Sequence, residues 1–469
     1  MVQRLLTKYG LIVHIACICL YPVGVLSQSR VSGLVPLFWF VFVAAEWLLL
    51  LPSVKRGETL ADARRRVLHG MAWDPFSYIG VALVALVAVQ CLNSGLELVY
   101  LPDADVWQLS DPPVAWAPFA VERCAAITQL ALFTACVTVG ITLRVAVGKA
   151  AKRALLQLLA RASGAVAVVG VALALQGCEP YAALAAGGGL TSVGTFFGFW
   201  LMLGIGLFIE ARARDSHTPR LLFLLAGLGN LLGMLFFASP LMVVVFSVFS
   251  VILLLYGAIY LAPLVSKSVQ LKLFVGTLFC VGGIAVSLVY LFPQNPVSAK
   301  LGSVWPVDAY WDALSARNSV RAEAAVTVWQ QHPWTGVGAD GFYHYVALAV
   351  KQEQWGLVEQ DRALALSDGT QFLCEYGVFG AGLLLAAVIA LLIPLCYRAR
   401  LLWQHKGHDT MSDRTFLFRL SPVVTTGVLA VLLCCLESFM ASPFRMPALL
   451  LSWTCVLAAM PAFLPERGA

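Results

Sequence analysis

Long apolar runs, each of about 20 residues, recur along the chain and are separated by short turns that carry Lys and Arg. Hydrophobic residues make up 60% of the sequence and charged residues only 12%, about half of the charged fraction in soluble domains. Inside a bilayer each backbone polar group must find a partner within the protein, and runs of this length without strict alternation satisfy that need as helices. The sequence therefore predicts an all-α, polytopic integral membrane protein.

The apolar runs predict about twelve transmembrane helices. They lie near residues 9–26, 32–52, 77–96, 124–145, 162–178, 192–210, 221–238, 241–262, 273–293, 373–397, 421–440 and 447–464. The first run is followed by no clear small-residue cleavage site, so we expect it to be retained rather than removed as a signal peptide. The chain then divides into helices 1–9 within 1–293, a large polar loop with short helices over 294–371, and helices 10–12 within 372–469.

The basic residues predict an orientation in the membrane. Most of the 31 Lys and Arg residues fall in alternate turns, which we assign to the cytoplasmic side because basic loops stay there. An even number of spans then places both termini in the cytoplasm. The opposite face receives few basic residues, its loop at 97–120 is acidic, and the polar segment 294–371 becomes one large exterior loop.

Several function classes find little support in the composition. The net charge of +6 is spread over many membrane-facing turns, where anionic headgroups rather than nucleic acid are the expected partner. Most of the 12 cysteines lie in predicted spans, and there is no CxxC motif and no Cys/His cluster. We therefore expect a lipid bilayer as partner, and no disulfide framework, metal site or cofactor.

A helix is the most readable element of the exterior loop. Residues 318–319 (Asn-Ser) precede the stretch 320–331, in which apolar residues recur at helical spacing and Arg321 occupies the first turn. His332 and Pro333 end this helix, because Pro disfavours the helical state in the residue before it.

A glycine-rich turn follows that helix. Residues 336–341 (GVGADG) match the dinucleotide fingerprint GxGxxG, but that motif has physical meaning between a strand and a helix, whereas here it follows a helix and a proline. We interpret Gly336 and Gly338 as a tight turn that lets two elements pack closely. The alternative is a backbone cradle for a phosphate or sugar.

Three segments stand in a characteristic order along the chain. Residues 191–196 (TSVGTF) open a span after a Gly-rich loop, residues 321–342 combine an arginine, a helix and an HPxxGxG turn, and residues 367–380 (SDGTQFLCEYGVFG) return the chain to the membrane. Together with about twelve spans and one large late exterior loop, this order resembles the O-antigen ligase and O-antigen polymerase (Wzy-type) superfamily of bacterial envelope glycosyltransferases.

The resemblance implies a chemistry in the bacterial inner membrane. Such proteins resemble inverting glycosyltransferases that take an undecaprenyl-diphosphate-linked glycan as donor and a lipid or glycan as acceptor, without a nucleotide sugar or required metal. An exterior histidine would activate the acceptor hydroxyl, and exterior arginines would neutralise the diphosphate. A hydroxyl needs a base with a pKa near neutrality, whereas a diphosphate needs fixed charge, which guanidinium supplies through two parallel hydrogen bonds.

The sequence departs from the family at the histidine. When Glu375, Gly377 and Gly380 are aligned with the family pattern, the histidine position is occupied by Leu366, which cannot transfer a proton. The usual Ser-Arg between the seventh and eighth spans is replaced by residues 238–240 (Ala-Ser-Pro). Of the usual charged set, only Arg321 keeps its place.

Three explanations stay open. In the first, the base has moved to His332 or His344, with Asp368 as a further candidate, and Arg317 or Arg362 replaces the missing arginine. In the second, the protein binds a lipid-linked glycan without catalysing transfer. In the third, the local alignment differs. The structural alternatives are that His332 caps a helix end and that His344 lies at the membrane interface.

A transporter or flippase is the alternative from another class. About twelve spans are common there, but the sequence shows no inverted repeat and no helix broken at the midplane. Glu375, just inside the tenth span, is the acidic residue that we link to the site, where it would orient a neighbouring arginine or backbone amide. We predict Arg321, Arg317 and Arg362 as diphosphate ligands, with Glu375, Gly336 and Gly338 in support.

Overall fold

The computed structural model describes residues 58–101, 106–176, 182–213, 220–261, 307–351, 353–354, 364–365, 367–404 and 420–464. Most of them are helical. The α-helices are α3 (Leu60–Trp73), α4 (Pro75–Leu92), α5 (Arg123–Ile141), α6 (Lys149–Leu175), α7 (Ala182–Ala213), α8 (Arg220–Phe237), α9 (Pro240–Leu261), α12 (Val307–Gln331), α13 (Gly341–Ala349), α14 (Asp368–Gln404), α16 (Pro422–Glu437) and α17 (Pro447–Ala459). A π-helical turn, η1 (Thr142–Ala146), extends α5, and two 3₁₀ turns, η4 (Pro443–Arg445) and η5 (Met460–Phe463), flank α17.

The described helices are those of a multi-pass membrane protein. Six segments within them are long and apolar enough to cross a bilayer: Pro75–Leu92, Arg123–Ala146, Lys149–Leu175, Ser192–Ala213, Pro240–Gly257 and Asp368–Leu402. Three shorter apolar helices accompany them: Leu222–Phe237, Pro422–Glu437 and Pro447–Phe463. The predicted spans 9–26, 32–52 and 273–293 lie outside the described residues.

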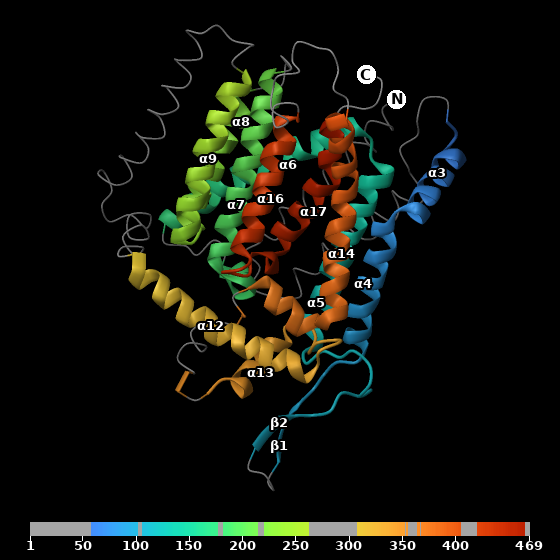
Figure 1. Ribbon diagram of the computed structural model, residues 1–469, viewed down its shortest axis with the longest axis vertical. Helices are drawn as coiled ribbons and strands as arrows, with labels where there is room; N and C mark the ends of the chain where they lie inside the picture. The colour runs from blue at the N-terminus through green and yellow to red at the C-terminus, as the bar shows by residue number, and fades with distance from the viewer. Residues whose placement is uncertain are drawn as a thin grey trace.

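The apolar helices form a bundle with α7 near its centre. Helix α7 packs against α8, α16, α6 and α9, while α4 packs against α5 and α14 (Figure 1). The aromatic side chains of Phe196, Phe199 and Trp200 on α7 are fully buried in this core. Large apolar side chains on the outer faces of α4 and α14, among them Val81 and Ile389, are exposed, as expected where the surrounding solvent is lipid.

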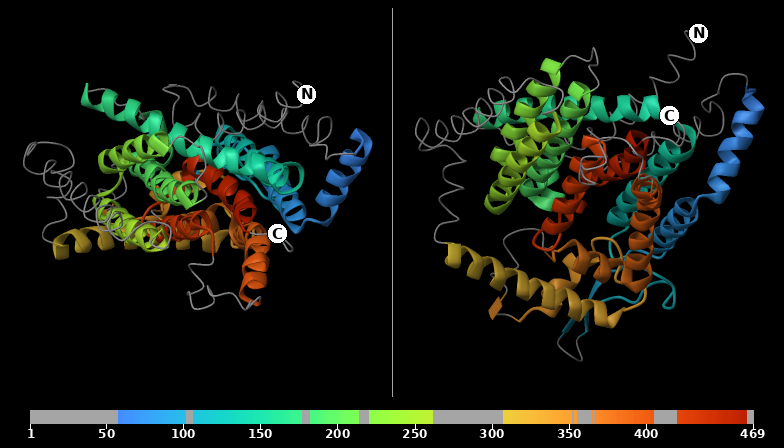
Figure 2. Two further views of the ribbon diagram at one scale, coloured as in Figure 1. Left: turned by 90° about the horizontal axis from the view of Figure 1, so that it is seen from above. Right: turned by 45° about the horizontal axis from the view of Figure 1, so that its top comes forward.

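Helix α12 lies across one end of the bundle, and α13 and the β-hairpin lie at the same end (Figures 1 and 2). The predicted end of α12 before His332 and Pro333 is confirmed, but the predicted start is wrong. The helix begins at Val307, so residues 318–319 lie inside it, and the Ser319 hydroxyl donates to Ala316 O within the helix instead of capping it. The loop therefore contains a long helix, where only short ones were predicted.

The polar loop has a hydrophobic core of its own. The helical stripe on α12 is confirmed, because Ala324, Ala325 and Val328 are buried at the spacing expected for one helix face. This stripe packs with Val337 after the glycine-rich turn, with Phe342 on α13 and with side chains of neighbouring segments. The core holds α12 and α13 against the end of α14.

A β-hairpin adds a layer that the sequence analysis did not predict. Strands β1 (Leu98–Leu101) and β2 (Val106–Leu109) pair antiparallel within the acidic loop that follows α4. The return strand leads to Phe119, which joins the core of the polar loop, and to Ala120, whose backbone pairs with Ser94. The base of the hairpin and Phe119 therefore lie beside α12 and α13, while the paired strands project away from the bundle (Figure 1).

Candidate functional site

The glycine-rich turn docks onto a break in α14. At Gly377 the backbone leaves the helical conformation with φ 62° and ψ −171°. The amides of Val337 and Gly338 donate to the carbonyls of Cys374 and Glu375, at 3.0 and 2.8 Å. The two sequence motifs, HPxxGxG and the segment that returns to the membrane, are therefore joined through their backbones.

Three glycines make this close approach possible. Gly336, Gly338 and Gly377 have φ values of 69°, 83° and 62°, in the left-handed region that glycine tolerates without strain. A Cβ atom on Gly336 would overlap the backbone of Glu375, and one on Gly377 would overlap the backbone carbonyl of Trp334. These contacts match the close-packing interpretation of the GVGADG segment, which here connects α12 to α13.

A buried arginine lies at the centre of the site. The Arg445 side chain is 4% exposed and pairs with two carboxylates: Nη1 lies 2.8 Å from Asp340 Oδ1, and Nη2 contacts Glu375 Oε1. Glu375 Oε1 also accepts from Gln371 Nε2 at 2.5 Å. The three ionic groups come from η4, from the turn before α13 and from α14, so this cluster ties together segments that are far apart in sequence.

The electrostatic balance keeps Arg445 charged. Burial alone disfavours the charged guanidinium, but the carboxylates of Glu375, Asp340 and Asp368 and the nearby Tyr376 outweigh it and raise the pKa of Arg445 above its usual value. A permanent positive charge is therefore held inside the protein at this end of the bundle. A charge in such a position needs partners, because an unpaired buried ion costs several kcal/mol.

Asp368 anchors the start of α14 to the loop that carries Arg445. Its amide donates to Ser438 O at 2.9 Å, and its Oδ2 accepts from Phe444 N at 3.1 Å. The side chain is buried, and Oδ1 has no hydrogen-bond partner among the described residues. Asp368 therefore has a definite structural role next to Arg445, with one carboxylate oxygen left over.

Arg321 lies on the buried stripe of α12 and is 1% exposed. Its Nη1 donates to Leu364 O at 3.3 Å. The next amide, Ala365 N, donates to Gln371 Oε1 at 2.7 Å, and Gln371 in turn donates to Glu375. Hydrogen bonds at the two ends of the 364–365 peptide group therefore connect Arg321, through Gln371 and Glu375, to Arg445.

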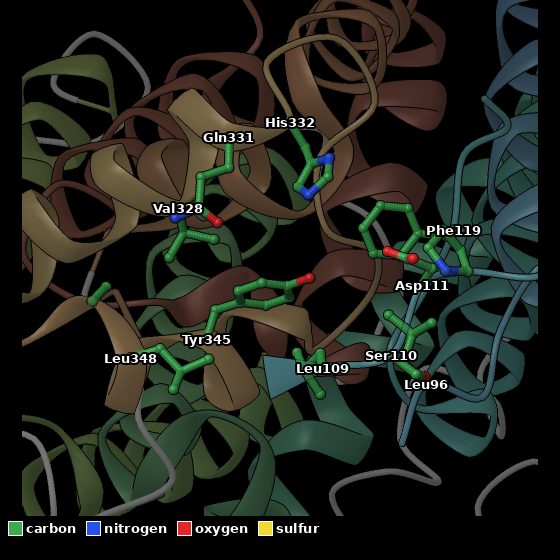
Figure 3. Close-up of a pocket in the computed structure, with 12 residues that line it drawn as sticks. Leu96, Leu109, Ser110, Asp111, Phe119, Val328, Gln331, His332, Tyr345 and Leu348 are labelled. Carbon is green, nitrogen blue, oxygen red and sulfur yellow. The ribbon is translucent and has the colours of Figure 1, made fainter. Parts of the chain in front are cut away.

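His332 lines a cavity. It ends α12, with its amide bonded to Trp329 O at 3.0 Å, and its ring packs edge-on against Phe119 at 4.9 Å between centroids. The ring is directed into a cavity of about 440 Å³ (Figure 3). Burial lowers the pKa of His332 below its usual 6.5, so the imidazole is neutral at neutral pH and able to accept a proton.

His344 lies on another element, helix α13. Its Nε2 is 3.7 Å from Glu122 Oε2, next to the start of α5, and its ring contacts Tyr343. Within the described part of the chain neither His332 nor His344 has a hydrogen bond or ion pair to Arg321, Arg445 or Asp368. The two histidines and the buried charges are therefore separate features of the fold, whereas Asp368, the third candidate base, lies next to Arg445.

Some predicted site residues cannot be placed. Arg362 and Leu366 lie outside the described residues, and Arg317 lies on α12 at a position whose side chain is not described. Among the residues that the structure describes, no group of three or more His, Cys, Asp or Glu side chains could hold a metal ion.

Arg445 is the site residue that sequence reasoning missed. The sequence analysis placed few basic residues on the exterior face, and an arginine in the short turn between two apolar runs was the available signal. A buried partner could not be assigned without knowing that Asp340 and Glu375 face the same turn.

Comparison with known proteins adds no family. No protein-family model matches the chain, and a search of curated proteins finds no match. The functional argument therefore depends on the residues themselves.

We expect acidification to destabilise the protein through His332. Because burial lowers the folded-state pKa below 6.5, the unfolded chain binds more protons between the two pKa values, and the free energy of unfolding falls as the pH drops below about 6.5. The measurement is the thermal unfolding midpoint of purified protein at about pH 7.5 and about pH 5.5, beside His332→Gln. The unfolding midpoint of the variant should fall less on acidification than that of the wild type. An equal fall in both proteins would exclude His332 as the cause.

Proposed function

We propose that this protein is an O-antigen ligase-like membrane protein that handles an undecaprenyl-diphosphate-linked glycan during cell-surface polysaccharide assembly. The proposed reaction is glycan transfer or polymerisation onto a lipid or glycan acceptor at the exterior face of the inner membrane. The observation that carries the proposal is the pair of buried arginines, Arg321 and Arg445, connected by hydrogen bonds at one end of an apolar helix bundle.

The arrangement favours different roles for the two arginines. Arg445 is balanced by Glu375 and Asp340, so we assign it to positioning the start of α14. We assign Arg321 to the lipid diphosphate because it keeps the place of the arginine in the family that the sequence resembles, and because a guanidinium supplies fixed positive charge in a planar fork that matches phosphate oxygens. Asp368 and Glu375 then hold the segment to which Arg321 is bonded.

We also propose the topology that this function needs. Twelve spans with both termini in the cytoplasm would place the end of the bundle at α12, α13 and the hairpin on the exterior side, as the distribution of basic turns favours. The loop 294–371 would then meet the lipid-linked donor at the exterior surface, and the carrier tail would lie between helices.

A noncatalytic glycan-binding protein is the second candidate. Two observations favour it: Leu366 stands at the position of the family's histidine, and the two histidines on the described part of the loop bond to neither Arg321 nor Arg445. Binding of the donor diphosphate needs fixed positive charge, which we assign to Arg321, whereas transfer also needs a base.

The test of the arginine assignment is reconstitution. Purified protein in liposomes is supplied with an undecaprenyl-diphosphate-linked glycan and candidate acceptors, and both donor binding and donor consumption are followed. Arg321→Ala should abolish binding and consumption, while Arg321→Lys should retain part of both, because Lys keeps the charge but loses the planar fork. Equal function in the two variants would remove Arg321 from the mechanism.

The same assay separates the two candidate functions. Donor consumption that is lost in His332→Ala, His344→Ala or Asp368→Asn would assign the base to that residue, provided that donor binding persists in the variant. A donor that binds through Arg321 but is never consumed with any acceptor would support the noncatalytic candidate.

A further inference from the structure

The cavity lined by His332 is a second feature of the polar loop, and the assignment of Arg321 and Arg445 above makes no use of it. Its volume of about 440 Å³ falls in the roughly 300–1,000 Å³ range of small-molecule sites. Three separate segments line it: the hairpin and the chain after it, the end of α12, and α13. Neither Arg321 nor Arg445 is among the lining residues.

The charges of the lining disfavour an anionic ligand. Among the described residues no Lys or Arg lines the cavity, and the exposed Asp111 contributes a carboxylate. His332 is neutral at neutral pH because burial lowers its pKa, and burial raises the pKa of Tyr345 to about 12, which keeps the phenol protonated. A phosphate or a carboxylate would therefore meet no positive charge among these lining residues, and a neutral ligand fits them better.

The polar groups of the lining match hydroxyl groups. The Gln331 amide and the Tyr345 hydroxyl can each donate and accept, whereas the Asp111 carboxylate accepts only. Sugar hydroxyls also donate and accept, so such a set can serve several of them at once. Figure 3 shows the Tyr345 phenol and the His332 imidazole directed into the same space.

The lining of the cavity also includes aromatic and aliphatic side chains. Phe119 and Tyr345 present aromatic rings, and Leu109 and Leu348 lie on the hairpin side and the α13 side. A pyranose has apolar C–H faces as well as hydroxyl edges, and it fits a cavity that combines aromatic surface with a few placed polar groups. A purely apolar ligand would leave these polar groups without partners.

We propose that this cavity binds a neutral pyranose ring, held by Gln331 and Asp111 at its hydroxyls and by Tyr345 and Phe119 at its C–H face. That the ring belongs to the glycan of the donor or acceptor rests on the function proposed above. The cavity would then select neutral sugars over uronic acids and sialic acids at this subsite, separately from diphosphate recognition by Arg321.

The test is binding of neutral methyl hexopyranosides to the full chain. Saturation-transfer NMR is recorded on protein in phosphatidylcholine nanodiscs, because sugar-headed detergents would compete, with a methyl hexopyranosiduronate as the anionic comparison. Gln331→Leu keeps the side-chain size but removes the amide, and Leu348→Trp fills the cavity from an exposed position on α13. Thr327→Ala, at an exposed position of α12 outside the cavity lining, is the matched control.

The wild type and Thr327→Ala should bind at least one neutral glycoside more strongly than the uronate. Gln331→Leu should weaken that binding by roughly two- to tenfold, the effect of losing one hydrogen bond, and Leu348→Trp should abolish it. Binding that survives in Leu348→Trp, no binding of any neutral glycoside, or preference for the uronate would overturn the proposal.

Donor binding, read in parallel, separates the two proposals. If Arg321→Ala leaves donor binding intact while the neutral glycosides still depend on Gln331, the proposed function fails and the sugar site stands. If donor binding depends on Arg321 but neutral glycosides do not bind, the function stands and the sugar site fails.

Discussion

Replacing Arg445 with alanine should destabilise the protein by about 3–5 kcal/mol, the effect of removing one partner from a buried ion pair. The variant leaves Glu375 fully buried without its cation, and Asp340 loses the same partner. Helix α14, the 3₁₀ turn η4 and the turn before α13 would then lose the contact that joins them. The measurement is the thermal unfolding midpoint of the purified protein in detergent, monitored by size-exclusion chromatography with fluorescence detection.

Two further variants make this prediction specific. Arg66→Ala breaks an ion pair with Glu58 in which the arginine side chain is 31% exposed, and it should cost no more than about 1 kcal/mol. Arg445→Met combined with Glu375→Gln removes both charges of the innermost pair, and it should recover part of the stability lost in Arg445→Ala. If Arg445→Ala unfolds at the wild-type temperature, the buried charge cluster does not hold the fold together.

The second large effect is expected at Gly377. Its φ of 62° and ψ of −171° lie in a region that is essentially restricted to glycine, where another residue costs about 1–3 kcal/mol of strain. In Gly377→Ala the new Cβ would also overlap the backbone of Trp334, so the strain cannot be relieved by a side-chain movement. We expect the glycine-rich turn to separate from α14, with a lower unfolding temperature and loss of donor binding in the reconstituted system.

Gly382→Ala is the matched control on the same helix. A Cβ at Gly382 meets no atom within 4 Å, so this change should be neutral or stabilising by up to about 1 kcal/mol, because alanine restricts the unfolded chain. If Gly377→Ala and Gly382→Ala unfold at the same temperature, the break in α14 is not a constraint on the fold.

Local signals predicted the elements well. Apolar length predicted the long helices, because hydrocarbon forces backbone hydrogen bonds to be satisfied inside each segment. The spacing of Ala324, Ala325 and Val328 predicted the buried face of α12, and Pro333 predicted its end. The start of α12 was mispredicted because Asn-Ser is a capping signal that a long helix tolerates in its interior.

Long-range placement was not predictable from those signals. The β-hairpin is one example, since strands of four residues carry little periodicity. The position of His332 is another: it ends a helix, as predicted, but whether its ring faces Arg321 or a cavity depends on how the hairpin packs against α12. Arg445 looked like any exterior arginine until its partners were known.

The sequence by itself determined that the protein lies in a membrane and that most of its described residues form helices. An apolar chain with basic turns must form membrane helices, and glycines at 336, 338 and 377 permit backbone conformations that other residues resist. Only the tertiary structure decided which charges meet. Arg445, Asp340 and Glu375 are separated by 105 and 70 residues along the chain, and a buried ion is stabilised by whichever partner the fold brings within reach, which local sequence does not encode.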